Sequence, residues 1–463
     1  MTGGVLIEKG LEDWQILQQN ENGMGRAHIS GTYVLTSDEL LDHVTVSARI
    51  LLEDTGEVIL PWRNAVLSEN YHWEVDFDDI PRGGLYRLET CMAVEGSDGN
   101  DHIPRGDLVL HFGVGDIFVI AGQSNASGRG RDPIYDPPEL GVHALRNSGR
   151  WSIATHPLNE TTGSIFDAHY EIINTGHSPA LAFAKKLKRE LGYPIGLLQT
   201  ALGGKKISYW KPDGTGILYT EMVDMIKTYC PDGVKGVYWH QGCNDAAEFE
   251  SDFYYDRFQE MVEHLRADLG DPDLPLLTVQ MGRYTAAVAR TEQSDYNWAV
   301  LREAQRRAAH QLPNIYIVPS NDLKLYDMIH NCSASNLILG ERLASAALYE
   351  LYGKGRHYKA PEPERIREVE PGKLEVVFSH VTHWLNPYEV PADELPLTVE
   401  DEQGVVAITE YACDKDTITL TLARPLAGRA ALSGAHQTNP PALILCDCAT
   451  LPMLSFYQME IEK

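Results

Sequence analysis

Short apolar runs alternate with stretches of helical periodicity from Asp116 to about residue 352, and this pattern constrains the fold of the chain more than any other feature. We predict strands at 116–122, 194–202, 234–241, 275–281 and 314–320. Ser178 and Pro179 predict the start of a long helix, and Gly192 predicts its end. Apolar strands separated by helices are typical of a parallel sheet covered on both faces. We therefore predict a doubly wound α/β domain with a parallel five-stranded sheet over residues 114–356.

The two flanking segments have a different periodicity. Apolar and polar residues alternate at 44–50 and 73–77, and again after residue 360, at 374–378 and 418–423. A period of two is typical of strands with one buried face. We predict a β-sandwich-like N-terminal domain over residues 1–113 and a β-sandwich-like C-terminal domain over 360–463.

Charge and composition narrow the function classes. The chain carries 39 Lys and Arg residues against 66 Asp and Glu residues, a formal net charge of −27. Such an acidic chain repels nucleic acid and anionic membranes, so we expect neither as a partner. We see no apolar run of membrane-spanning length and no secretory signal at the start. Seven irregularly spaced cysteines indicate reduced thiols, and we expect a cytoplasmic protein of bacterial type.

Polar residues and glycines follow every predicted strand, where α/β sheets bind their ligands. In strand order these are Gln123-Ser124-Asn125, Gly203-Gly204-Lys205, Gln241 through Asn244 and Asp245, Arg283, and finally Asp327 with His330. Taken singly, each has an ordinary structural explanation, such as a helix N-cap, a tight turn or a hydrogen-bonded amide. Their joint order at successive strand ends favours a catalytic site.

The residue types suit nucleophilic catalysis. A serine hydroxyl needs a base to take its proton, and His330 can serve Ser124 in this way. Asp327 lies three residues before His330, which on a helical turn puts both side chains on one face, where the carboxylate can orient the imidazole. The Ser124 amide, the Gly203 amide and the Gln241 side chain can donate to an oxyanion.

These segments resemble a known family. AGQSN at 121–125, GLLQTALGGKKISYW at 196–210, WHQGCND at 239–245 and DMIH at 327–330 are similar to motifs of the SGNH-hydrolase superfamily. They most resemble its carbohydrate-esterase branch, the sialate O-acetylesterase and acetylxylan-esterase-like proteins. The resemblance covers about 115–350 and implies an SGNH or flavodoxin-like fold and a serine esterase with no metal or organic cofactor.

The chain departs from the pattern of that branch at three positions. Cys243 stands where the branch usually has Glu, Ala126 replaces a common Met, and Asn331 replaces Pro after the histidine. The role of the missing Glu is either vacant or taken by Asp245. A thiol beside the site could itself be a nucleophile, but Ser124 has the better supported base.

The resemblance implies an esterase that removes O-acetyl groups from a carbohydrate through an acetyl-serine intermediate, with the acetylated sugar and water as substrates. We predict substrate contacts from the following residues: Gln123, Asn125, Lys205, Trp210, Asn244, Asp245 and Arg283. The cations at 129, 131, 205 and 206 could hold a carboxylate, as in sialic acid, or could be ordinary solvated charges. Two alternatives stay open: a lipid or thioester hydrolase, and a carbohydrate-binding protein with an unused hydrolase fold. The β domains could bind sugar, shape the pocket or form a homo-oligomer.

Overall fold

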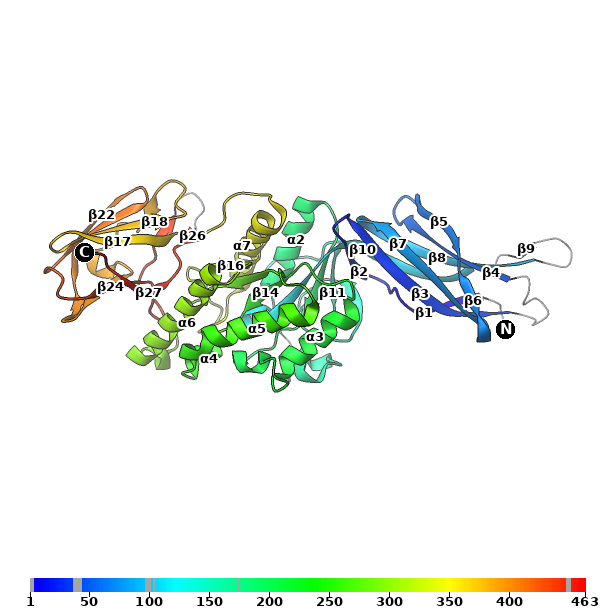
Figure 1. The fold of residues 1–463 in the computed structure, drawn as a ribbon, viewed down its shortest axis with the longest axis horizontal. Helices are drawn as coiled ribbons and strands as arrows, with labels where there is room; N and C mark the ends of the chain where they lie inside the picture. The colour runs from blue at the N-terminus through cyan, green and yellow to red at the C-terminus, as the bar shows by residue number, and fades with distance from the viewer. Residues whose placement is uncertain (1–3, 36–43, 96–100, 103–104, 173–174, 447–450) are drawn as a thin grey trace.

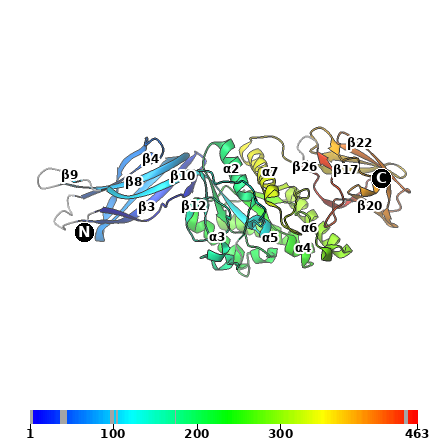
Figure 2. The same ribbon diagram turned by 180° about the vertical axis from the view of Figure 1, so that it is seen from behind.

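The computed structural model describes residues 4–35, 44–95, 101–102, 105–172, 175–446 and 451–463. Three parts lie in a row along the long axis of the molecule, with an α/β part between two β-rich parts (Figure 1). The N-terminal and C-terminal residues lie toward opposite ends of this row, as the view from behind also shows (Figure 2). In the described part of the chain, no helix is both long enough and apolar enough to cross a lipid bilayer.

The central sheet has the order β12-β11-β13-β10-β14-β15-β16. Its strands are β10 (Arg105–Gly122), β11 (Val142–Leu145), β12 (Trp151–Ile153), β13 (Ile195–Gln199), β14 (Gly236–His240), β15 (Leu276–Val279) and β16 (Ile315–Val318). All neighbouring pairs are parallel except β11 with β12. The five predicted strands are present, but a five-stranded sheet was wrong, because β11 and β12 extend it. Both strands are short and lie in a turn-rich segment without periodicity, so no sequence pattern marked them.

Seven α-helices belong to the described part of this domain. They are α1 (Ser124–Ser127), α2 (Pro179–Leu191), α3 (Ile217–Tyr229), α4 (Cys243–Ala247), α5 (Tyr254–Leu269), α6 (Glu292–Gln311) and α7 (Ser333–Tyr352). One apolar cluster packs α3, α5 and α6 against the sheet, and a second packs α2 and α7 against it. The helix ends predicted for α2 are present: Ser178 Oγ accepts from the Ala180 amide, and Gly192 ends the helix at a φ of 79°. The sheet is therefore covered on both faces.

The N-terminal part contains two antiparallel layers that share one core. The first layer is β1 (Gly4–Lys9), β3 (Met24–Val34), β7 (His72–Pro81) and β6 (Val66–Ser68), and the second contains β4 (Val44–Leu52), β5 (Val58–Asn64), β8 (Gly83–Glu95) and β9 (Asp101–His102). The long strand β10 pairs first with β8 and with β2 (Ile16–Gln18), and then with β13 and β14. The predicted boundary between residues 113 and 114 falls inside this strand, so one strand links the two cores.

The described residues of the C-terminal part form three antiparallel sheets, and the two larger ones share a core. Its strands are β17 (Glu362–Glu370), β18 (Lys373–Ser379), β19 (Leu385–Asn386), β20 (Leu397–Asp401), β21 (Gly404–Val406), β22 (Ile408–Asp414), β23 (Thr417–Leu422), β24 (Ala430–Gly434), β25 (Leu445–Cys446), β26 (Leu451–Pro452) and β27 (Phe456–Glu460). Arg302 of α6 is fully buried and ties this part to the α/β part. Its guanidinium donates to the carbonyls of Gly282 on one side and of Ala435 and Gln437 on the other.

Candidate active site

Ser124, His330 and Asp327 lie in one chain of hydrogen bonds. Ser124 begins α1 directly after β10, and the other two residues lie between β16 and α7. His330 Nε2 is 2.9 Å from Ser124 Oγ, and His330 Nδ1 is 2.7 Å from Asp327 Oδ2. The carboxylate can only accept, so Nδ1 carries the ring proton and Nε2 is free to accept from the serine hydroxyl. The structure thus brings together three residues that are up to 206 positions apart in sequence.

The environment of Asp327 keeps this carboxylate ionised. Burial raises its pKa, but hydrogen bonds from His330 and from the Ile329 and His330 amides outweigh burial, so the pKa lies below its ordinary value. The two amides donate to Oδ1 over 2.9 and 2.8 Å, while Oδ2 faces the imidazole. An ionised, fixed carboxylate can stabilise an imidazolium as it forms.

A glycine makes the sharp turn that presents Ser124. Gly122 has a φ of 119°, in the left-handed region, and a Cβ on it would lie 2.3 Å from the His240 carbonyl oxygen. Only glycine fits such a close approach between β10 and β14. The Gln123 amide then donates to the same carbonyl over 2.9 Å, which fixes the turn one residue before the serine.

Asn125 fastens the serine turn to the histidine loop. Its Nδ2 donates to the Ile329 carbonyl over 3.3 Å, and its Oδ1 accepts from the Asn331 amide over 3.1 Å. These two contacts bracket His330 in sequence. We predicted Asn125 as a substrate contact, but the structure uses its amide to hold the two halves of the site together.

Gln123 and Asn244 were also predicted to contact substrate, and the structure pairs them with each other. Gln123 Nε2 donates to Asn244 Oδ1 over 3.1 Å, and Gln123 Oε1 accepts from the Gly242 amide over 3.0 Å. The turn after β14 is therefore fixed to the serine turn after β10.

The predicted oxyanion donors are only partly available. The Ser124 amide is at the first position of α1, where a helix offers its amides no internal partner. The Gly203 amide already donates to Glu171 Oε1 over 2.7 Å. The Gln241 amide group donates to Asp245 Oδ2 over 2.5 Å and to the Lys205 carbonyl over 3.0 Å. Since both hydrogens of Gln241 are engaged, the prediction that it offers a free donor was wrong for this structure.

Asp245 and Cys243 are buried beneath the site. Burial raises the pKa of Asp245 to about 6, against the lowering effect of hydrogen bonds from Gln241 and the Ile207 amide. Asp245 thus holds the Gln241 side chain, and as a fully buried residue it cannot contact a sugar as we predicted. Burial raises the pKa of Cys243 to about 12, so this thiol stays protonated and is a poor nucleophile.

The remaining predicted substrate contacts have different environments. Trp210, at the end of a short helix η5 (Ile207–Trp210), is fully buried and packs edge-on against Trp239, so its prediction as a sugar contact was wrong. Half-buried Lys205 places Nζ 4.8 Å from the Tyr209 ring centre. Arg283 donates to the Leu323 carbonyl over 3.0 Å, four residues before Asp327. Of these, Lys205 and Arg283 are still reachable from solvent.

A second histidine–aspartate cluster lies elsewhere in the α/β domain, and the sequence analysis missed it. His156 Nε2 and His177 Nε2 each lie 3.0 Å from Asp136 Oδ2, and Lys185 Nζ lies 2.6 Å from Asp136 Oδ1. Within the described ranges, the trio of Asp136 and the two histidines is the only group with metal-ligand spacing. The lysine already neutralises the carboxylate, and His156 Nδ1 accepts from the Ser178 amide over 3.4 Å, which leaves the proton on Nε2. These groups do not suit a cation.

Glu171 is the other residue that sequence reasoning missed. It follows a short helix η4 (Asp167–His169) in a segment without periodicity, so nothing in the sequence marked it. Its carboxylate contacts both the Gly203 amide and Arg129.

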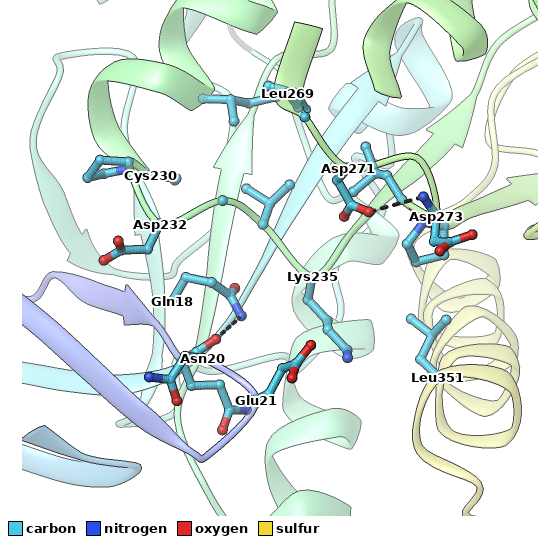
Figure 3. Close-up of a pocket in the computed structure, with 18 of the residues that line it drawn as sticks. Gln18, Asn20, Glu21, Cys230, Asp232, Lys235, Leu269, Asp271, Asp273 and Leu351 are labelled. Atoms are coloured by element: carbon cyan, nitrogen blue, oxygen red, sulfur yellow. Dashed lines mark hydrogen bonds between the residues drawn. The ribbon is translucent and has the colours of Figure 1, made fainter. Parts of the chain in front are cut away.

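A large cavity lies at the opposite end of the sheet from Ser124. Its volume is about 1180 Å³, and it is lined by residues that precede strands, such as Lys235 before β14 and Asp273 before β15 (Figure 3). Gln18 and Asn20 of the N-terminal part complete it. Because the strands are parallel, this cavity lies at the opposite sheet edge from the candidate active site, whose residues follow the strands.

Comparisons with known proteins agree with this geometry. A family model described as "Carbohydrate esterase, sialic acid-specific acetylesterase" matches residues 114–349. A probable carbohydrate esterase of Arabidopsis thaliana is 28% identical over 256 residues, which is 50% of this chain and 90% of the plant protein. A crystal structure of a carbohydrate acetylesterase from Xanthomonas citri is 22% identical, with a TM-score of 0.66, and the match covers 96% of this chain and 97% of that one. The last likeness shows that the fold recurs over nearly the whole chain, both flanking β parts included. The chain belongs to the carbohydrate esterase family of sialic acid-specific acetylesterases.

Proposed function

We propose that this protein is a serine esterase that removes O-acetyl groups from a sugar. The observation that carries the proposal is the chain from Ser124 Oγ through His330 to Asp327, with distances of 2.9 and 2.7 Å. An esterase of the carbohydrate family needs an activated nucleophile, and the hydrogen bonds from Ser124 to His330 and from His330 to Asp327 can provide this activation.

The first half of the reaction forms an acetyl-enzyme. Ser124 Oγ attacks the acetyl carbonyl carbon while His330 Nε2 takes the hydroxyl proton, and Asp327 stabilises the resulting imidazolium. The Ser124 amide donates to the oxyanion. Such a donor is worth roughly 3 kcal/mol of barrier, whereas the Gly203 amide stays occupied by Glu171 Oε1. His330 then gives its proton to the sugar oxygen, which leaves as an alcohol.

The second half uses water. His330 Nε2 removes a proton from the water as its oxygen attacks the acetyl carbon, and the tetrahedral intermediate collapses to acetate and free Ser124. The proton returns from His330 to the serine oxygen. The only species consumed are the acetylated sugar and one water molecule.

The test is acetate release from acetylated sugars and from an aryl acetate. Ser124→Ala should abolish release from both while circular dichroism and the melting temperature stay near those of the wild type. Cys243→Ala is the matched control, because it removes the neighbouring thiol and should keep most of the activity. A fluorophosphonate probe should label the wild type and Cys243→Ala but not Ser124→Ala; absence of labelling in the wild type would favour a carbohydrate-binding protein instead.

A further inference from the structure

A partly buried ion pair lies beside the turn that carries the proposed nucleophile. Glu171 accepts from Arg129 Nη2 over 2.8 Å at one oxygen and 3.1 Å at the other, and from the Gly203 amide over 2.7 Å. The side chains of Glu171 and Arg129 are only 18% and 16% exposed. A Cβ on Gly203 would fall 2.1 Å from Arg129 Nη2, so the glycine makes room for this pair.

The pair is connected to the serine turn. Arg129 Nη1 donates to Ser127 Oγ over 3.2 Å, and Ser127 Oγ donates to the Ser124 carbonyl over 3.2 Å. On the other side, the Leu202 amide donates to the Gly122 carbonyl over 2.9 Å, which puts the Gly203 strand end next to the same turn. A substrate acetyl group at Ser124 therefore brings its sugar close to Glu171.

Two other cations near this edge are also engaged by the protein. Lys206 pairs with Glu248 over 2.9 Å and with Glu250 over 2.6 Å. The Arg283 guanidinium donates a hydrogen bond to the Leu323 carbonyl. Lys205 contacts the Tyr209 ring and Arg131 is exposed, and neither forms an ion pair among the described residues, so these two cations could still meet an anion.

We propose that Glu171 is a specificity-determining residue that makes the site select uncharged acetylated sugars over acetylated sugar acids. This inference rests on the proposed esterase function. Glu171 neutralises Arg129, which is linked to the serine turn through Ser127, and holds a carboxylate oxygen against the Gly203 amide. A sugar carboxylate entering here would be repelled by Glu171 or would have to displace it from a partly buried pair in which Arg129 Nη2 contacts both carboxylate oxygens. A neutral sugar can instead donate a hydroxyl hydrogen to the second oxygen of Glu171.

The experiment compares two substrates that differ by one carboxylate: methyl 3-O-acetyl-xyloside and methyl 3-O-acetyl-glucuronoside. We expect kcat/KM of the wild type to favour the xyloside by about tenfold or more, as expected for like charges close together at a partly buried site. Glu171→Gln keeps an acceptor for the Gly203 amide and removes the charge. It should raise kcat/KM for the glucuronoside by about tenfold while the value for the xyloside changes less than about threefold.

Two control variants distinguish a role of Glu171 in substrate selection from a merely structural role. Glu248→Gln removes an exposed carboxylate on the same edge and should leave the substrate ratio unchanged. Lys205→Met asks whether that lysine recruits anions instead. Equal or reversed wild-type preference, an equal change of both substrates in Glu171→Gln, or loss of glucuronoside turnover in Lys205→Met alone would overturn the proposal.

The proposed esterase function can fail separately. An aryl acetate reports on the chemistry without a sugar, so its hydrolysis with a wrong preference overturns only the role of Glu171. If Glu171→Gln does not fold, the wild-type ratio still decides. Calorimetric binding of methyl xyloside and methyl glucuronoside to Ser124→Ala gives the same preference without turnover, and tighter binding of the glucuronoside would contradict the proposal.

Discussion

The α/β domain contains two histidine–aspartate clusters, which combine the same residue types in different surroundings. At His330, one ring nitrogen faces Asp327 and the other faces the Ser124 hydroxyl, and the imidazole and carboxylate are 22% and 40% exposed. At Asp136, both histidines direct Nε2 to the same carboxylate oxygen, Lys185 contacts the other, and no side chain of the four is more than 16% exposed. A histidine–aspartate pair can transfer a proton in catalysis only when the imidazole nitrogen that does not face the carboxylate contacts a reactive group that the substrate can reach. We call the cluster of His330 and Asp327 the open cluster, and the cluster of Asp136, His156, His177 and Lys185 the closed cluster.

The largest expected effect is on catalysis at the open cluster. His330→Ala removes the base and should lower kcat for aryl acetate hydrolysis by about 10⁴-fold or more, and Asp327→Asn should cost about 10³- to 10⁴-fold. His156→Ala, the matched change in the closed cluster, should alter kcat per folded molecule by less than about threefold. A similar loss from both histidine variants would show that the two clusters do not differ in role.

At the closed cluster the expected effect is on stability. Asp136→Ala leaves the buried Lys185 ammonium without its carboxylate, which typically costs about 3–5 kcal/mol of unfolding free energy. The double variant Asp136→Ala/Lys185→Met removes both charges and should recover much of that loss. Urea unfolding followed by circular dichroism gives both values, and an unchanged midpoint for Asp136→Ala contradicts the account.

A third carboxylate, Asp245, should make stability depend on pH with a definite sign. Burial raises its folded-state pKa to about 6, above the unfolded value of about 4. Its contribution is therefore fully present below pH 4 and is lost as the pH rises through about 6. Between pH 4 and pH 7, the unfolding free energy of the wild type should fall relative to that of Asp245→Asn by on the order of 2 kcal/mol. Parallel stability curves for the two proteins over this range would mean that Asp245 does not titrate as described.

Asp136 should act with the opposite sign. Burial raises its pKa, but hydrogen bonds from His156, His177 and Lys185 outweigh burial and hold it far below the ordinary value. Its stabilisation is present above about pH 4 and is lost as the pH falls further. The difference in unfolding free energy between the wild type and Asp136→Asn, measured from pH 6 to pH 3, should therefore narrow toward the acid end. Curves that diverge as the pH falls would reverse this assignment.

The smallest predicted effect concerns Asn125, which holds the two halves of the open cluster together. Asn125→Ala removes the contacts to the Ile329 carbonyl and the Asn331 amide, so His330 should sample positions away from Ser124. We expect kcat to fall by about 10- to 100-fold with a smaller change in KM. Asn244→Ala offers a comparison in the neighbouring turn. A selective rise of KM in Asn125→Ala would instead support the substrate contact that the sequence first suggested.

The same contrast explains what the sequence could predict. Asp327 and His330 are three residues apart and follow a strand, as Ser124 does, so local spacing and strand order together pointed to the open cluster. Asp136, His156 and His177 are 20 or more residues apart in a segment without periodicity, and only tertiary packing joins them. Glu171, β11 and β12 also lie in this segment without periodicity, so sequence patterns did not indicate them either.

Burial was the other limit on prediction. Trp210 and Asp245 follow strands, as the residues of the candidate site do, yet both are fully buried. Gln241 is close to the site, but the orientation of its amide depends on a hydrogen bond to Asp245. The sequence motif does not indicate that hydrogen bond. Residue type and strand order therefore indicate which segments converge, whereas the direction of each side chain requires the packed structure.

The central claim is that the Ser124 hydroxyl, activated by His330, becomes acetylated during turnover. The most direct measurement is to mix the enzyme with an aryl acetate, quench it in acid within the first turnover, and locate the added acetyl group by peptide mass spectrometry. The account predicts one acetyl group on the peptide that contains Ser124, formed much more slowly in His330→Ala. Acetylation at another residue, or rapid hydrolysis by Ser124→Ala, would contradict it.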